Sequence, residues 1–81
     1  MNITVKYFAV LRELVGKREE VIDCPEAQTV AGLLADLEKR YPKLESTLAR
    51  VAVAVNEEYS SRDVQLKDGE EVALLPPVAG G

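Results

Sequence analysis

The first segment of the chain alternates between the two faces of an extended backbone. Across residues 2–8, one face carries Ile3, Val5 and Tyr7, and the other carries Thr4, Lys6 and Phe8. A period of two is typical of a β-strand, so this segment predicts the first strand. The spacing then changes to that of a helix, with apolar positions at Phe8, Leu11, Leu14 and Val15. This change predicts a short helix over residues 9–15 that Gly16 ends.

The strongest periodic signal lies in the middle of the chain. Residues 19–24 favour a second strand that Pro25 closes, and Thr29 is a good N-cap for a helix. The apolar positions of that helix fall at helical spacing, at Val30, Leu33, Leu34, Leu37 and Tyr41. Because a residue before proline avoids helical geometry, Pro42 predicts that the helix ends near Arg40 or Tyr41.

The second half of the chain has the pattern of β-structure. The β-branched run over residues 51–55 predicts a central strand, buried on at least one face and largely on both. Residues 56–59 indicate a turn that leads into a short strand, and Leu66 stands as an isolated apolar anchor. Asp68-Gly69 is a turn signal before a final strand over residues 70–75.

These elements predict the fold class. Their order is ββαβββ with a short helix after the first strand, and one long helix must cover one face of a mixed sheet of about five strands. The arrangement is α+β, a β-grasp (ubiquitin-like) sheet. A chain of 81 residues suits one domain. We assign residues 1–75 to this β-grasp domain and residues 76–81 to an extended C-terminal tail.

Composition narrows the classes of function. The 14 acidic and 10 basic residues give a net charge of −4, which disfavours nucleic-acid binding. Cys24 is the only cysteine, the N-terminal residues lack the apolar run of a signal peptide, and no apolar stretch approaches the roughly 18 residues of a membrane span. We therefore expect a cytoplasmic protein that binds neither nucleic acid nor membrane.

The sequence lacks the residues of several common active sites. Without histidine, it supplies neither a catalytic triad nor a Cys-His pair, and we predict no metal site. Its internal glycines stand alone, so no phosphate-binding loop is present. Cys24 has no neighbouring base and is expected in the core or at a strand end. Three carboxylate pairs are expected to form solvated edges: Glu19-Glu20, Glu57-Glu58 and Glu70-Glu71.

The tail is the segment in which chemistry is expected. Pro76 and Pro77 cannot extend a hydrogen-bond ladder, so the chain must project beyond the last strand. Val78 and Ala79 offer small apolar contacts, and Gly80-Gly81 allows the backbone to thread a narrow channel. Two final glycines arise by chance in about 0.4% of chains of this composition. The alternative is a frayed end without function, but disorder does not need the two prolines.

Three segments carry a resemblance to a known family. They are Tyr7-Phe8-Ala9-Val10-Leu11-Arg12-Glu13-Leu14-Val15-Gly16, Val53-Ala54-Val55-Asn56, and the run from Leu66 to Gly81. Together they resemble the small subunits of molybdopterin synthase, and the resemblance runs from end to end. The short helix after the first strand distinguishes this pattern from that of the thiazole-forming sulfur carriers.

The resemblance implies a cycle of sulfur transfer in which the chain is non-catalytic alone. An activating enzyme would use ATP to adenylate the Gly81 carboxylate, and a sulfurtransferase would convert it to a thiocarboxylate. The tail, Pro76, Pro77, Val78, Ala79 and Gly80, would thread the large subunit, in a heterotetramer, and give sulfur to cyclic pyranopterin monophosphate. The chain itself would bind no cofactor.

A carrier also needs a surface on which its partners dock. The candidates are the apolar residues near the tail: Phe8, Leu74 or Leu75, Pro76 and Val78. Phe8 is equally compatible with the core, and alternation allows only one of Leu74 and Leu75 to point inward.

Three other functions remain open from the sequence. The chain is compatible with a sulfur carrier for thiazole, tRNA thiolation or another metal-pterin pathway. It is also compatible with a ubiquitin-like modifier conjugated through Gly81, or with a β-grasp interaction module that has no covalent chemistry.

Overall fold

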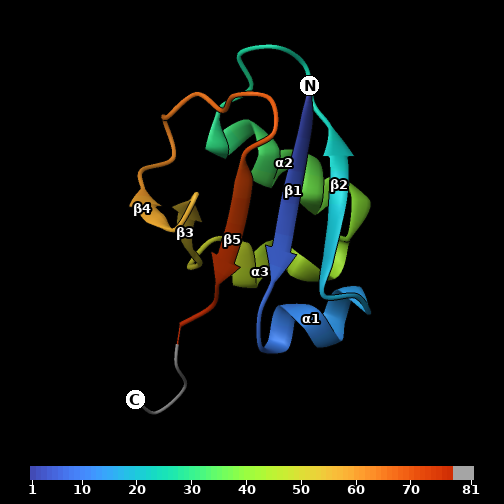
Figure 1. The fold of residues 1–81 in the computed structure, drawn as a ribbon. Helices are drawn as coiled ribbons and strands as arrows, with labels where there is room; N and C mark the ends of the chain where they lie inside the picture. The colour runs from blue at the N-terminus through green and yellow to red at the C-terminus, as the bar shows by residue number, and fades with distance from the viewer. Residues whose placement is uncertain (78–81) are drawn as a thin grey trace.

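The computed structural model describes residues 1–77, and the predicted α+β fold is confirmed. Within this range five strands form one mixed sheet in the order β2-β1-β5-β3-β4. The strands are β1 (Asn2–Tyr7), β2 (Glu19–Asp23), β3 (Ala52–Val55), β4 (Glu58–Ser60) and β5 (Glu71–Leu75). β1 and β5 run parallel, and the other neighbours are antiparallel. Figure 1 shows β1 and β5 side by side in the middle of the sheet.

The helices lie on one side and at one end of this sheet (Figure 1). They are α1 (Val10–Val15), α2 (Val30–Arg40), the 3-10 helix η1 (Pro42–Leu44) and α3 (Glu45–Leu48). As predicted, the Thr29 hydroxyl caps α2 by accepting a hydrogen bond of 3.0 Å from the Gly32 amide. Gly16 ends α1 with a φ of 85°, a left-handed conformation that glycine adopts without a Cβ clash.

The core fills the space between the sheet and the helices. It contains the inward positions of β1, β2 and β5, the apolar stripe of α2, and Leu66, which is the predicted anchor. Its largest fully buried side chains are Tyr7, Ile3, Leu11, Ile22, Leu33, Leu37, Leu44, Leu48 and Leu74. The opposite face of the sheet carries no helix in the part of the chain that the structure describes (Figure 1).

Two features of the second half differ from the sequence prediction. β3 is flanked on both sides, but the central strand of the sheet is β5. Val53 on the core face and Ala54 on the open face are both buried, which confirms burial on at least one face, whereas Ala52 is exposed, so burial on the open face is incomplete. η1 and α3 were not predicted, although Pro42 at the start of η1 and the spacing of Leu44 and Leu48, both buried, are helical signals.

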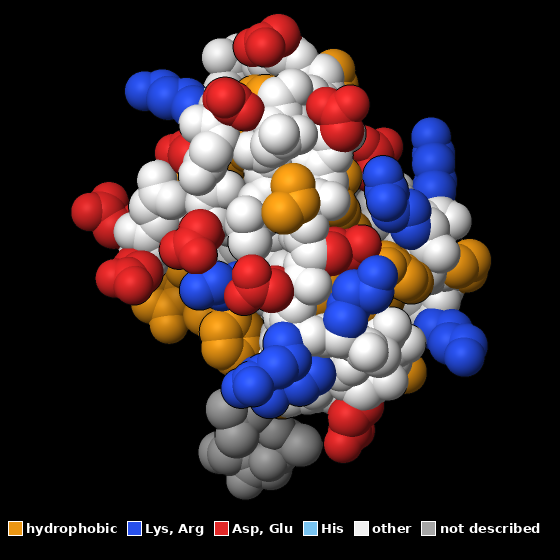
Figure 2. Space-filling model, turned by 45° about the vertical axis from the view of Figure 1, so that its right-hand side comes forward, with side chains coloured by type: hydrophobic (Ala, Val, Ile, Leu, Met, Phe, Trp, Pro, Cys, Tyr) orange, Lys and Arg blue, Asp and Glu red, His pale blue; other side chains and the backbone are white. Residues whose placement is uncertain are grey.

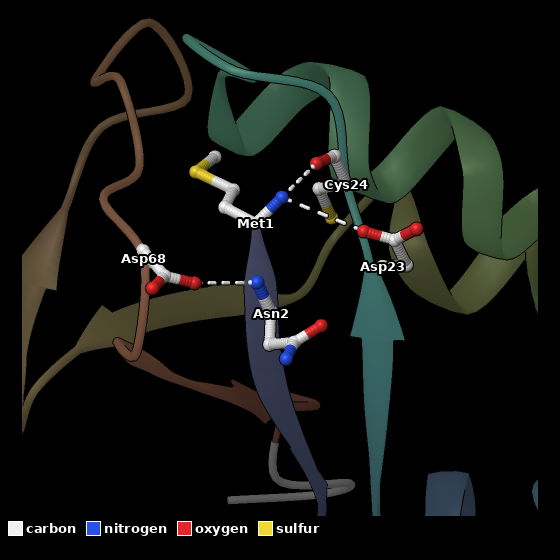
Figure 3. Close-up of polar contacts among 5 residues, drawn as sticks. All are labelled: Met1, Asn2, Asp23, Cys24 and Asp68. Carbon is white, nitrogen blue, oxygen red and sulfur yellow. Dashed lines mark hydrogen bonds and ion pairs between the residues drawn. The ribbon is translucent and has the colours of Figure 1, made fainter.

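The end of the sheet away from α1 is held by polar contacts of the first residues (Figure 3). The Met1 amino group donates to the Cys24 carbonyl at 2.7 Å and lies 3.4 Å from the Asp23 carboxylate. The backbone amide of Asn2 donates a hydrogen bond to Asp68 Oδ1 at 2.7 Å. These bonds join β1 to the end of β2 and to the turn before β5, so they help to fix the register of the three strands.

Candidate functional site: the root of the tail

The parallel pairing of β1 and β5 brings two distant segments of the chain together. Tyr7 is opposite Leu74 in the register, so both strands end at the same edge of the sheet. Phe8 and the start of α1 therefore lie beside Leu75 and Pro76, where the chain leaves the sheet. The sequence placed these residues in the tail and in the docking surface, but only the parallel register makes them neighbours.

The two leucines at the end of β5 point to opposite faces, as the alternation predicted. Leu74 is fully buried and contributes to the core, so it is not available to a partner. Leu75 is half-buried and lies opposite Ala52, on the open face. Leu75 is therefore the member of the pair that fits a docking role.

A shallow apolar hollow surrounds the root of the tail on the open face. We call it the tail-root patch, and its volume is about 510 Å³. Phe8 is half-buried and lies outside the core cluster, which favours its surface role over its core role. Val78, Ala79, Gly80 and Gly81 lie outside the described residues. The lining residues are Phe8, Ala9, Arg50, Ala52, Tyr59, Leu75, Pro76 and Pro77.

Sequence reasoning missed several residues of this patch. Tyr59 on β4 is 80% exposed, the largest exposed fraction among the large apolar side chains of the described chain. It is opposite Ala54 in the register of β3 and β4, and this pairing places its ring on the open face. Alternation along residues 58–60 was the available signal, but a strand of three residues is too short to show a period.

The backbone at Ala9 has an unusual conformation beside Phe8. Its φ is 52° and its ψ is −128°, a region that L residues with a Cβ rarely adopt. The Leu11 amide donates to the Phe8 carbonyl at 3.1 Å, which closes a tight turn between β1 and α1. This turn directs Phe8 toward the tail-root patch.

Several charged residues on and beside the open face have structural partners. Lys6 Nζ lies 3.0 Å from Glu71 Oε1, and this hydrogen bond raises the pKa of the exposed Lys6. Glu70 accepts hydrogen bonds from the Asn56 side chain and the Lys67 amide. Glu20 lies on the core face, opposite Val5. Its side chain is only 13% exposed, so the prediction that the carboxylate pairs form solvated edges is wrong for this residue.

Within residues 1–77, the structure contains no group of three or more residues with metal-ligating side chains. Cys24 is buried at the end of β2, as expected, and burial raises the pKa of its thiol. No helix of the described chain is long and apolar enough to cross a membrane. The described residues thus form a largely apolar hollow where the chain leaves β5.

These features define the class of the protein as a ubiquitin-like β-grasp protein. Its residues 5–81 match the model of the ThiS family, and the chain belongs to that family. It is 40% identical over 77 residues to the molybdopterin synthase sulfur carrier subunit of Dictyostelium discoideum, covering 91% of this chain and 90% of that protein. It is 39% identical to the Chlamydomonas reinhardtii subunit of the same name, and the match covers 100% of both chains.

Solved structures support the same assignment. A molybdopterin converting factor subunit 1 of Pyrococcus furiosus has a TM-score of 0.87 at 40% identity, over 96% of this chain and 99% of that chain. SAMP1 of Haloferax volcanii has a TM-score of 0.89 at 31% identity, with 100% of both chains covered. A chain from the complex of subunits 1 and 2 of the molybdopterin-converting factor of Helicobacter pylori has a TM-score of 0.70 at 26% identity, also over 100% of both chains.

Proposed function

We propose that this protein is the sulfur carrier for molybdenum cofactor biosynthesis and the small subunit of molybdopterin synthase. The observation that carries the proposal is the full-length similarity to molybdopterin synthase sulfur carrier subunits. The tail-root patch supports it, because Phe8, Leu75 and Pro76 form an apolar contact surface where the tail leaves the domain. A partner bound there is placed to receive residues 76–81.

The chemistry starts at the Gly81 carboxylate. An α-carboxyl group has a pKa of roughly 3.3 to 3.7, so it is ionised at neutral pH and is a poor electrophile. Transfer of AMP from ATP, by an activating enzyme, gives the carbonyl carbon a good leaving group. The persulfide of a sulfurtransferase then displaces AMP to form an acyl disulfide, and a second thiol cleaves its S–S bond to leave the thiocarboxylate and a disulfide. ATP belongs to the activating enzyme, and the carrier contributes only its tail and its docking surface.

The large subunit is the proposed site of sulfur transfer. Pro76 and Pro77 stiffen the exit of the tail, and Val78, Ala79 and Gly80 extend it into the partner's active site. The thiocarboxylate sulfur of Gly81 bonds to cyclic pyranopterin monophosphate, and hydrolysis of the acyl–sulfur bond leaves the sulfur on the pterin and restores the carboxylate. Two such transfers build the dithiolene. A tethered nucleophile has a high effective concentration at the acceptor. We propose a heterotetramer in the cytoplasm, with one carrier at each end of a dimer of large subunits.

Removal of the terminal carboxylate tests the proposal. The wild-type chain, a chain that lacks Gly81 and a chain amidated at Gly81 are each incubated with activating enzyme, ATP, sulfur donor and large subunit. Only the wild-type chain is expected to gain a sulfur-for-oxygen exchange by intact mass and to form pterin dithiolene. All three are expected to show the same melting temperature. Equal dithiolene formation by the amidated chain would reject the carrier function.

A second candidate function is that of a protein modifier conjugated through Gly81. It is favoured by the TM-score of 0.84 at 30% identity to the Haloferax volcanii small archaeal modifier protein 1, over 95% of this chain and 98% of that chain. Activation of Gly81 is common to both functions. Digestion of whole-cell protein distinguishes them, because conjugation leaves the tail remnant on target lysines, whereas a carrier leaves none.

A further inference from the structure

A second hollow lies on the other side of Phe8 from the tail-root patch. We call it the cationic hollow, and its volume is about 330 Å³. It is formed by the end of β1, by α1 and by the turn that leads into β2. Three of its six lining residues are basic and one is acidic, although the whole chain has a net charge of −4. The lining residues are Lys6, Tyr7, Phe8, Arg12, Arg18 and Glu19.

The positive charges of this hollow are poorly compensated within residues 1–77. Lys6 is paired with Glu71, but the ion pairs of the described chain include neither Arg12 nor Arg18. Arg12 Nε is buried and has no hydrogen-bond partner among the described residues. A buried donor without an acceptor costs about 1–3 kcal/mol, so the site gains stability from an added acceptor. Figure 2 shows several Lys and Arg side chains in the lower half of the face that it draws, with Asp and Glu side chains among them.

The position of Phe8 links the hollow to the docking surface. Phe8 lines both the cationic hollow and the tail-root patch. A protein that covers Phe8 and Leu75 therefore also removes water from the neighbouring Arg12. Because desolvation of an unpaired cation is costly, a partner that fits this surface must place negative charge there.

We propose that the cationic hollow is a docking site for carboxylate side chains of the protein that takes the tail, with Arg12 and Arg18 as its ligands. This proposal rests on the proposed function, because the large subunit is the partner to be tested. The arginine guanidinium group matches a carboxylate through two parallel hydrogen bonds. The hollow thus gives the docking an orientation, because it places two further positive charges on one side of a patch whose lining is apolar except for Arg50 and the Tyr59 hydroxyl.

Charge reversal in the hollow tests this assignment. The double variant Arg12→Glu, Arg18→Glu is compared with Lys39→Glu, Lys43→Glu, which makes the same change in net charge on exposed residues of α2 and η1. Binding to the purified large subunit is measured at about 0.05 M and about 0.3 M salt. We expect the hollow variant to bind at least about tenfold more weakly, through slower association and faster dissociation, and the control to stay within about twofold of wild type.

Salt dependence and a milder variant complete the test. Wild-type association is expected to slow as salt rises, whereas association of the charge-reversed hollow variant is expected to speed up, because salt screens its repulsion from the partner. Arg12→Gln, Arg18→Gln removes the charges without adding repulsion and is expected to weaken binding in the same direction. Melting temperatures show whether each variant is folded. An equal loss in hollow and control variants would attribute the effect to net charge and overturn the proposal, as would unchanged binding of both hollow variants.

The two proposals fail in different ways. If the wild-type chain binds the large subunit but forms no pterin dithiolene, the carrier function is wrong and the binding data still report on the hollow. If the wild-type chain forms dithiolene and the hollow variants bind normally, only the docking proposal is wrong. A last arm measures the labelling of Arg12 by an arginine-specific dicarbonyl reagent. If added acetate or phosphate protects Arg12 from this labelling as well as the large subunit does, the hollow is a site for small anions and the protein-docking proposal is overturned.

Discussion

The Tyr7 hydroxyl donates a hydrogen bond of 2.5 Å to Glu20 Oε2, on the side of the sheet that carries the core. Tyr41, which follows α2, donates to the same oxygen at 2.7 Å, and Lys17 Nζ lies 3.5 Å from the other oxygen. The two tyrosine rings meet edge to face with centroids 6.4 Å apart. One carboxylate therefore joins β1, β2 and the end of α2.

This cluster predicts a pH-dependent contribution to stability. Burial raises the pKa of Glu20, but the hydrogen bonds from Tyr7 and Tyr41 and the charge of Lys17 outweigh it, so the pKa lies below its usual range. A carboxyl whose pKa is lowered by folding stabilises the protein above its unfolded pKa of about 4.3. That contribution is lost as the pH falls through the lower, folded pKa.

We expect Glu20→Gln to lower the free energy of unfolding at pH 7 by about 1–3 kcal/mol. The difference from wild type should shrink as the pH falls below about 4, because the wild-type carboxyl is then protonated. Urea unfolding at several pH values between about 3 and about 7, on both sides of the unfolded pKa, measures this difference in the free energy of unfolding. Glu19→Gln on the same strand is the control, and it should stay within about 0.5 kcal/mol of wild type. Parallel curves for wild type and Glu20→Gln would contradict the role of this carboxylate.

Glu20 also shows what a pattern along the sequence cannot predict. Alternation correctly indicated that Glu19 and Glu20 face opposite sides, and it gave the strands and α2 from local periodicity. Which of the two faces the core depends on the register between β1 and β2, and the acceptor role depends on Tyr41, distant in sequence. Contacts of this kind are set by tertiary structure, so a pattern along the chain predicts a solvated edge instead.

The residues of the candidate site likewise include some that the sequence predicted and some that it missed. Phe8, Leu75 and Pro76 were found from their apolar character and their place near the tail. Tyr59 and Arg12 were missed because their roles follow from strand order and from burial. The positive φ of Ala9 was also missed, since a position that favours glycine is not visible when another residue occupies it.

The strained backbone of Ala9 predicts a stabilising substitution. A residue with a Cβ in a sparsely populated region costs about 1–3 kcal/mol, whereas glycine costs about 0.4–1 kcal/mol through the entropy of the unfolded chain. Ala9→Gly should therefore raise the free energy of unfolding by about 1 kcal/mol. Ala49→Gly is the control, because Ala49 has an ordinary helical φ of −62° and should lose about 0.5–1 kcal/mol. A lower urea midpoint for Ala9→Gly would show that the turn is not strained.

The opposite orientations of Leu74 and Leu75 predict opposite effects of truncation. Leu74→Ala leaves a cavity in the core and should cost about 2–5 kcal/mol of stability. Leu75→Ala should change stability by less than about 1 kcal/mol but weaken binding to the large subunit by about tenfold. Thermal unfolding and titration of the large subunit measure the two effects separately. The assignment of faces would be wrong if Leu75→Ala were the less stable variant.

Cys24 provides a chemical test of the core. Its side chain is 3% exposed, and burial, followed by the nearby charge of Asp36, raises the pKa of its thiol. Since the thiolate is the reactive form, alkylation at neutral pH should be slow in the folded protein and at least about a hundredfold faster in the urea-unfolded chain. A Cys24→Ala, Ser46→Cys variant, which places a thiol on exposed α3, gives the rate of an accessible cysteine. If iodoacetamide labelled native Cys24 as fast as this control, the end of β2 would open far more readily than its packing and its hydrogen bond to Met1 imply.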